Sequence, residues 1–363
     1  MKHRLNERIK NFNITILMSL FLLLSCGSGQ QPQAGKDGSE KGTGSLSEVL
    51  MEVGRSAESA FYSFMELVSG TLGLRVTKDT TKQQVGVYFS GLGKKLGEAS
   101  DELEQVAKKS EIERSKDSLL NKVIKEAVDA AKTILSTLKG HLESLKNIGD
   151  GDKLVDVKSD QQGVEADMDA LKRALKALQG IVETSEGVGI DKLKESSVKL
   201  DQASIGIANA KNGAKVLAAG HKAGEAVGDK AATIVSAVSG REMLESIVKS
   251  SEDKVAKITA NATASTTPLE FAVGGTAEHV SNSEQSKAAA VAGGIALRSL
   301  VKGGKLASHS TNNDEKAVQS AGITAVNKLL VAVEDIIKKT VKNVLDKVKK
   351  EVDEVRKPKT AVQ

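Results

Sequence analysis

Apolar residues recur every three or four positions over long stretches of this chain, and this spacing places them on one face of an α-helix. It predicts four helices in the first half of the chain, over residues 45–68, about 81–111, about 115–147 and about 164–184. A long last helix is predicted over about residues 314–356, where Val326, Leu330, Val333, Ile337, Val341, Val344, Val348, Val352 and Val355 repeat at the same spacing.

Between about residues 187 and 313 the chain becomes rich in alanine, glycine and serine, with only short apolar groups. We predict short helices here, joined by glycine-bearing loops, and a loop over residues 260–267 before Pro268. Small side chains bury little apolar area when they pack. We therefore expect this to be the least rigid part of the protein.

The composition favours an all-α fold. The 363 residues include three prolines, at Pro32, Pro268 and Pro358, so little interrupts a helix between them. Aromatic residues are only 2% of the chain, which argues against a sheet-rich fold. We predict an elongated multi-helix bundle in which long N- and C-terminal helices pack antiparallel as a membrane-proximal stalk.

Charge and metal-binding residues narrow the possible functions. With 52 basic and 47 acidic residues, the net charge of +5 is spread over mixed segments, unlike the basic face of a nucleic-acid-binding protein. One cysteine excludes an intramolecular disulfide, and the scattered His141, His221, His279 and His309 are expected to be solvent-exposed. We predict no catalytic residue, no cofactor, no metal ion and no nucleic-acid partner.

The N-terminus has the features of a lipoprotein export signal. Basic residues open the chain, and the apolar run over residues 14–24 is too short to span a bilayer. Ser25 and Cys26 follow this run, as in a bacterial lipobox. We predict cleavage between Ser25 and Cys26, followed by S-diacylglycerol attachment and N-palmitoylation at Cys26. Several acyl chains on one residue would anchor the protein stably.

The segment after Cys26 is predicted to be a flexible tether. Residues 27–44 read GSGQQPQAGKDGSEKGTG, a composition that is typical of random-coil linkers. The expected organisation is therefore a signal peptide over residues 1–25, a lipidated tether over 26–44 and a single helical domain over 45–363.

Three other features have more than one interpretation. Phe61, Tyr62 and Phe64 could line a ligand pocket, although bundle packing is the preferred interpretation. The acidic run over residues 149–152 suggests calcium but lacks the remaining ligands of an EF-hand, so we favour a solvated turn. The basic end over residues 338–359 is either a solvated face or a surface suited to anionic lipid.

Several segments together resemble the variable large protein family of Borrelia surface lipoproteins. The resemblance is carried by LMEVGRSAESAFYSFMELVSGTLG (residues 50–73), GLGKKLGEASDELEQVAKKSE (91–111), AVSGREMLESIVKSSE (237–252) and AAAVAGGIALRSLVKGGKLA (288–307). It covers essentially the whole mature chain, and Cys26 lies where the family has its lipidated cysteine.

The resemblance implies display on the outer membrane, facing the extracellular side, and a role in antigenic variation, with host antibodies as partners. It supplies no active-site residues. By composition, the candidate for the variable loops is the stretch over about residues 187–313. Because the tether and both terminal helices are expected at the membrane-proximal end, the distal part, also expected to be variable, is predicted over about residues 151–313. The leading hypothesis is a non-enzymatic variable antigen. The alternatives are an adhesin for a host matrix, glycosaminoglycan or plasma component, and an enzyme. The sequence leaves the host ligand and the oligomeric state open.

Overall fold

The fold was analysed in a computed structural model of the chain. Contacts between residues divide the chain into two units, Met1–Gly44 and Ser45–Gln363. The structure describes residues 74–112 and 119–356 together with Arg55, Ser59, Tyr62 and Met65, all within the second unit. The predicted tether lies outside the described residues, and so does most of the predicted helix over residues 45–68.

The described residues form helices and no β-strand, which confirms the predicted all-α fold. In chain order the elements are α3 (Lys82–Ile112), α4 (Leu119–Ser144), α5 (Met168–Gly187), α6 (Gln202–Ile205), η1 (Ala210–Leu217), α7 (Gly228–Ser236), α8 (Gly240–Val248), η2 (Glu252–Lys254), α9 (Pro268–Val273), α10 (Ala277–Ser281), α11 (Ala288–Leu300) and α12 (Asp314–Arg356).

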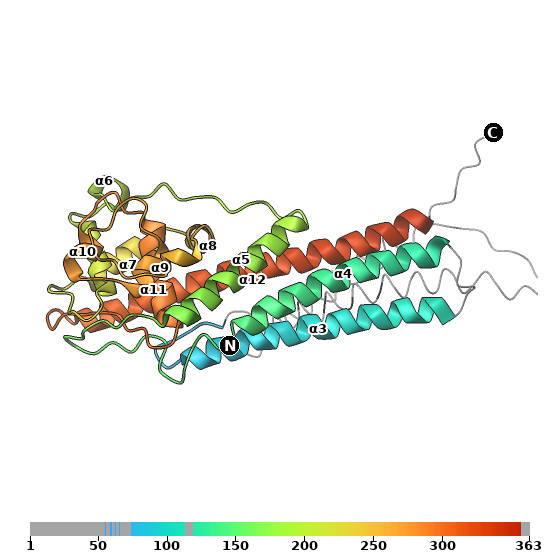
Figure 1. The fold of residues 1–363 in the computed structure, drawn as a ribbon, viewed down its shortest axis with the longest axis horizontal. Helices are drawn as coiled ribbons and strands as arrows, with labels where there is room; N and C mark the ends of the chain where they lie inside the picture. The colour runs from blue at the N-terminus through green and yellow to red at the C-terminus, as the bar shows by residue number, and fades with distance from the viewer. Residues whose placement is uncertain are drawn as a thin grey trace, which may run out of the picture. The chain divides into compact units, whose positions relative to one another are not determined.

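The long helices pack side by side as the apolar stripes predict. In Figure 1, α3 and α4 form a hairpin that runs along the C-terminal half of α12. We call α3, α4 and this half of α12 the stalk helices. Leu96 and Leu103 of α3 and Leu135, Leu138 and Leu142 of α4 are fully buried along the hairpin. The fold therefore places the predicted stripes at helix–helix contacts.

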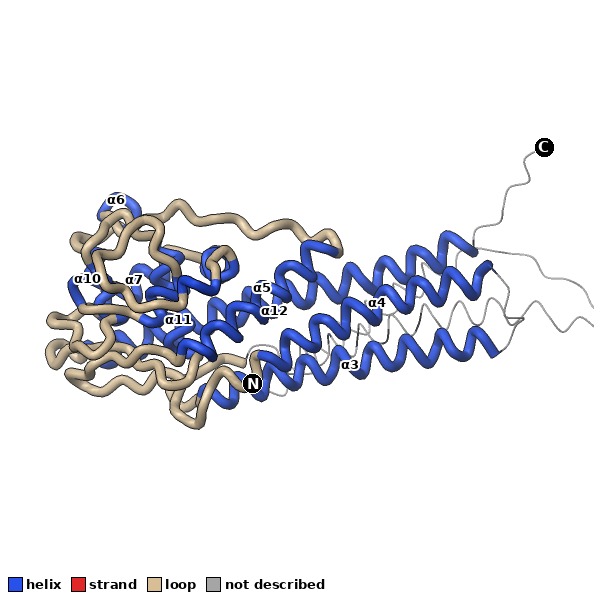
Figure 2. Tube along the Cα trace, in the orientation of Figure 1, coloured by secondary structure: helices blue, strands red, loops and turns tan. Residues whose placement is uncertain are grey.

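The short elements gather around the N-terminal half of α12 (Figures 1 and 2). We call residues 188–313, which contain α6 to α11, the short-element region. Helix α12 packs on α7, α8 and α11 at this end and on α4 at the other, so one helix connects both parts. Its predicted range of about 314–356 is confirmed.

The interior of the short-element region argues against the expectation that it is the least rigid part. All thirteen residues of α11 are buried, and most of them are alanine, glycine or other apolar residues. Small residues allow the backbones of neighbouring elements to approach closely. At Gly240, for example, an added Cβ would lie 1.9 Å from the Lys328 carbonyl oxygen, so α8 packs directly on α12.

The fourth predicted helix starts later than expected. It was predicted from about residue 164, but α5 begins at Met168. Val164 instead exchanges backbone hydrogen bonds with Lys305, at 2.9 and 3.0 Å. The Asp167 side chain then accepts a hydrogen bond from the Ala170 amide at 2.8 Å and caps the helix. A long-range backbone pairing therefore overrides the helical periodicity at this end.

Candidate functional surfaces

Two of the predicted functional features fall outside the described residues. These are Ser25 with Cys26, and the aromatic residues Phe61 and Phe64, so lipidation at Cys26 stays a prediction. Tyr62 is described and is 45% exposed, which does not favour a ligand pocket around its ring. No helix among the described ranges is both long and apolar enough to span a membrane.

In the described part of the chain, the acidic turn over residues 149–152 has a structural role, because it connects two other segments through hydrogen bonds. The Asp150 carboxylate accepts hydrogen bonds from the Gly303 and Asp152 amides, each at 3.0 Å. The Lys82 amide donates to the Asp152 carbonyl at 3.0 Å. Across residues 74–112 and 119–356, no cluster of His, Cys, Asp and Glu side chains could hold a metal ion. The turn thus connects the start of α3 with the loop after α11.

The buried side chain of Lys82 adds hydrogen bonds to the same connection between the start of α3 and the loop after α11. Its side chain is 2% exposed, and its ammonium group donates to the carbonyl oxygens of Val301 and Gly304, both at 2.8 Å. Burial lowers the pKa of Lys82 to about 8, although Asp150 and Asp152 act in the opposite direction. The charged lysine therefore ties the first stalk helix to the short-element region.

Arg298 is the second buried cation, and the sequence analysis did not identify it. Its guanidinium donates to the carbonyl oxygens of Ala272 and Ala218, both at 2.8 Å, and to that of Phe271 at 3.1 Å. Burial lowers the pKa of Arg298 to about 9. Because α11, α9 and the end of η1 all contribute, Arg298 fastens three elements through their backbones. The sequence feature that could have identified Arg298 as a buried residue is its position as a single charged residue inside the apolar run of residues 288–301.

The histidines do not follow the predicted pattern. Among the histidines that the structure describes, His221 is exposed, whereas His141, His279 and His309 are half-buried. The His141 ring packs against Gly180, where an added Cβ would lie 2.1 Å from the ring. Nδ1 of His279 is buried without a hydrogen-bond partner in the described part of the chain. For His141, the prediction overlooked the space that Gly180 leaves for the imidazole ring.

Of the six lysines over residues 338–350 of α12, three are paired along their own helix. Lys338 contacts Glu334 at 4.0 Å, and Lys339 contacts Asp335 at 2.8 Å, both at the i,i+4 spacing of a helix. Asp346 is paired with Lys342. These pairs offset part of the local positive charge. Lys347, Lys349 and Lys350 make no ion pair with the described residues, so positive charge remains toward the end of α12.

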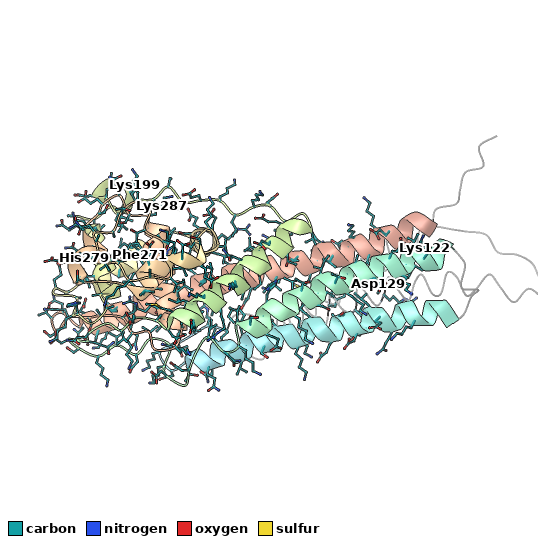
Figure 3. All side chains as sticks on the ribbon, in the orientation of Figure 1. Lys122, Asp129, Lys199, Phe271, His279 and Lys287 are labelled. Atoms are coloured by element: carbon teal, nitrogen blue, oxygen red, sulfur yellow. The ribbon has the colours of Figure 1, made fainter. Side chains whose placement is uncertain are left out.

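Side chains cover both parts of the second unit (Figure 3). Lys122 and Asp129 lie on α4 among the stalk helices, whereas Lys199, His279 and Lys287 lie in the short-element region. The stalk presents helix faces, but the short-element region presents loops from many segments. Loops accept sequence changes more readily than packed helix faces do.

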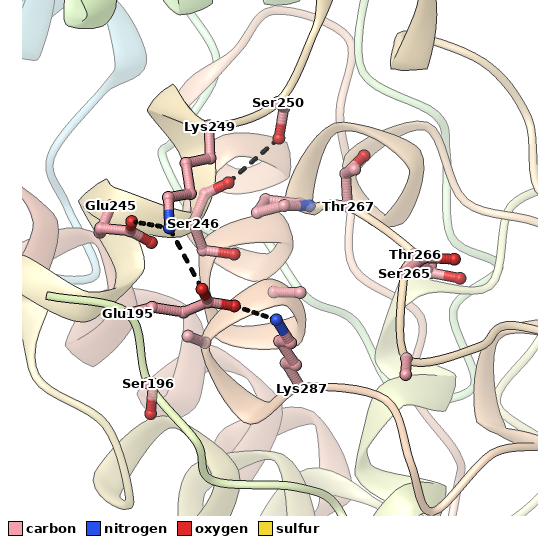
Figure 4. A pocket seen from close by; sticks show the side chains of 14 residues that line it. Glu195, Ser196, Glu245, Ser246, Lys249, Ser250, Ser265, Thr266, Thr267 and Lys287 are labelled. Carbon is pink, nitrogen blue, oxygen red and sulfur yellow. Dashed lines mark hydrogen bonds and ion pairs between the residues drawn. The ribbon is translucent and has the colours of Figure 1, made fainter.

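A cleft in the short-element region gathers charged and hydroxyl side chains (Figure 4). Its volume is about 140 Å³. Glu195 approaches Lys249 at 3.1 Å and also pairs with Lys287, and Lys249 contacts Glu245 at 2.8 Å. Hydrogen bonds from Lys287 and Lys249 lower the pKa of Glu195. We call this site the Glu195 cleft.

Comparison with known proteins identifies the class to which this helical chain belongs. The family model described as Borrelia lipoprotein matches residues 57–352. The fold is shared with the crystal structure of the Lyme disease variable surface antigen VlsE of Borrelia burgdorferi. That structure aligns with a TM-score of 0.66 and 22% identity, and covers 86% of this chain and 100% of its own. The chain belongs to the Borrelia lipoprotein family.

Within this family the chain belongs to the variable large proteins, which are lipoproteins of the outer surface. It is 61% identical to Variable large protein 25, 58% to Variable large protein 18 and 55% to Variable large protein 21, all of Borrelia hermsii. Each comparison covers 100% of both chains. The resemblance stated from the sequence is thereby confirmed.

Proposed function

We propose that this protein is a variable antigen that presents a replaceable folded surface to host antibodies and so supports immune evasion. The observation that carries this proposal is that the sequences of the relatives diverge widely while they still align with nearly the whole length of this chain. Identity falls from 61% with Variable large protein 25 to 25% with Variable large protein 14, which still covers 94% of this chain. Such divergence is expected where exposed side chains change and the packed framework persists.

The fold supplies a physical basis for this tolerance. Arg298 and Lys82 hold their neighbours through backbone carbonyl oxygens, which every residue type provides. Exposed substitutions away from packed or capped positions usually change stability by no more than about 0.5 kcal/mol. Many surface sequences are therefore compatible with one framework. We assign no catalytic residue, cofactor or metal ion to this function.

The anchor in this proposal is the lipid attached to Cys26. A cysteine that follows a short apolar run and precedes a glycine-rich tether supports this assignment. Cys26→Ala should abolish incorporation of radioactive palmitate and release the protein from the membrane fraction. A mutant chain that is still labelled and still sediments with membranes would refute the assignment.

The antigen function is tested on intact cells that express this chain or one of its relatives. Antiserum raised against this protein should bind cells that display it, and should bind poorly to cells that display Variable large protein 14, which is 25% identical. Protease added to intact cells should remove the reactive surface. Equal binding to both cell types would show that the exposed surface does not vary in the way proposed.

A further inference from the structure

The two halves of α12 differ in charge. Residues 314–337 contain two basic and four acidic residues, whereas residues 338–359, which continue past the end of the helix, contain nine basic and four acidic residues. The positive excess therefore lies at the end of α12 that is opposite to the short-element region (Figure 1).

Three lysines account for the excess at this end of the helix. Residues 351–359 are balanced, with three basic and three acidic residues. Lys347, Lys349 and Lys350 are exposed and make no ion pair with the described residues, and the preceding Asp346 is already paired within the helix. The charge of these three lysines is therefore available to an external anionic group.

The helices beside this end of α12 do not supply the missing counter-charge. Figure 1 shows the end of α3 and the start of α4 at the same end of the stalk helices. Two carboxylates there already have cationic partners. Glu126 is paired with Lys122 at 3.9 Å, and Glu104 is paired with Lys108 and Lys132, both at 2.7 Å.

The arrangement of the three lysines fits an extended surface better than a small ligand. Successive residues of an α-helix differ by about 100° around the axis. Lys349 is therefore about 200° away from Lys347, although both lie within one helical turn of Lys350. Side chains that surround a helix do not converge on one small anion, but they can all approach a plane that the helix meets with its end.

The three lysines are also close enough to the end of α12 to act on such a plane. Lys350 lies six residues before Arg356, the last residue of the helix, which is about 9 Å along the axis. The Debye length is about 10 Å at 0.1 M salt. A charged surface at the end of the helix therefore attracts these lysines.

We propose that the basic end of α12, formed by Lys347, Lys349 and Lys350, docks on anionic lipid headgroups of the membrane that carries the lipid anchor. Clusters of basic residues beside a bilayer bind anionic lipid in this way. The proposal rests on the anchor of the proposed function, which keeps the headgroups at a high effective concentration. Docking holds the stalk helices end-on and directs the short-element region away from the lipid.

Energy transfer from the protein to labelled headgroups tests the docking. The processed full-length chain is inserted through its anchor into vesicles of phosphatidylcholine, alone or mixed with phosphatidylglycerol. Lys122→Cys carries the donor at the start of α4, because the thiol of Cys26, the chain's one cysteine, is consumed by the anchor. Transfer should be about twofold greater in the anionic vesicles. This gain should vanish at about 1 M salt, where the Debye length is about 3 Å.

Substitution of the three lysines identifies the surface that docks. Lys347→Gln, Lys349→Gln and Lys350→Gln, combined in one chain, should reduce transfer in anionic vesicles to the value in neutral vesicles. Glutamine keeps the helix propensity of lysine, so α12 should persist.

A matched control removes the same charge elsewhere. Lys192, Lys194 and Lys257 are exposed in the short-element region. Their combined replacement by glutamine should leave the transfer gain unchanged. A donor at Lys199→Cys, in the short-element region, should show no gain in anionic vesicles.

Several results would overturn the proposal. These are equal transfer in both kinds of vesicle, a gain that persists in the triple variant of α12, and a gain for the donor at Lys199→Cys. Heparin binding that depends on the three lysines, without any transfer gain, would assign them to a polyanionic chain instead. Flotation with neutral vesicles reports the anchor separately. A chain that fails to float refutes lipidation at Cys26, and flotation with anionic vesicles then decides the docking.

Discussion

Arg298 provides the most demanding test of how the short-element region is held together. Arg298→Met removes the three donors to Ala272, Ala218 and Phe271 and leaves their carbonyl oxygens buried without these partners. An unsatisfied buried acceptor costs about 1–3 kcal/mol. The three acceptors together would cost about 3–9 kcal/mol. Because the variant no longer buries a charged guanidinium, we expect the lower end of this range, a loss of about 3 kcal/mol in the free energy of unfolding.

The assay is thermal and chemical unfolding followed by circular dichroism. A loss of this size in a domain of this length should lower the melting temperature by about 4–5 °C. Arg298→Lys should lose nearly as much, because one ammonium group cannot reach three separated carbonyl oxygens.

The matched control is Arg241→Met. Arg241 pairs with Asp335 at 3.0 Å, and its side chain is 36% exposed, so its removal should cost less than about 1 kcal/mol. If Arg298→Met were no more harmful than this control, or if Arg298→Lys restored full stability, Arg298 would not have the fastening role described.

Two further predictions concern other buried contacts. Gly180→Ala should displace the His141 ring and destabilise the α4–α5 contact by about 1–3 kcal/mol, measured by urea unfolding. Gly91→Ala, where an added Cβ meets nothing within 4 Å, should not destabilise. The pKa of Lys82, lowered from 10.5 to about 8, means that the unfolded chain binds more protons between these pH values. Stability relative to Lys82→Met should thus rise by about 2 kcal/mol from pH 7.5 to 9.5, and a pH-independent difference would contradict the burial argument.

The long helices were predictable because their apolar spacing and the scarcity of proline leave few alternatives. The long extent of α12 follows from this pattern, whose apolar stripe runs from Val326 to Val355. The start of α5 does not, because Val164 pairs with Lys305, a residue far along the chain. Local periodicity carries no information about such a partner.

The short-element region was harder to predict for a related physical reason. Helix α11 is buried on all sides, so it lacks the polar face that periodicity methods need. Lysine and arginine are usually solvent-exposed, so Lys82 and Arg298 were not identified as interior residues. Glu195, Lys249 and Lys287 meet only in the folded chain, and no sequence spacing connects them.

We propose that the region over about residues 151–313 carries the variant-specific surface on a shared framework. The most direct measurement uses a chimera in which this segment of Variable large protein 25 replaces the corresponding segment here. Variant-specific antisera should follow the exchanged segment, and the chimera should unfold within about 1 kcal/mol of the parent chains. Antisera that instead follow the remaining segments, including the stalk helices, would contradict the claim.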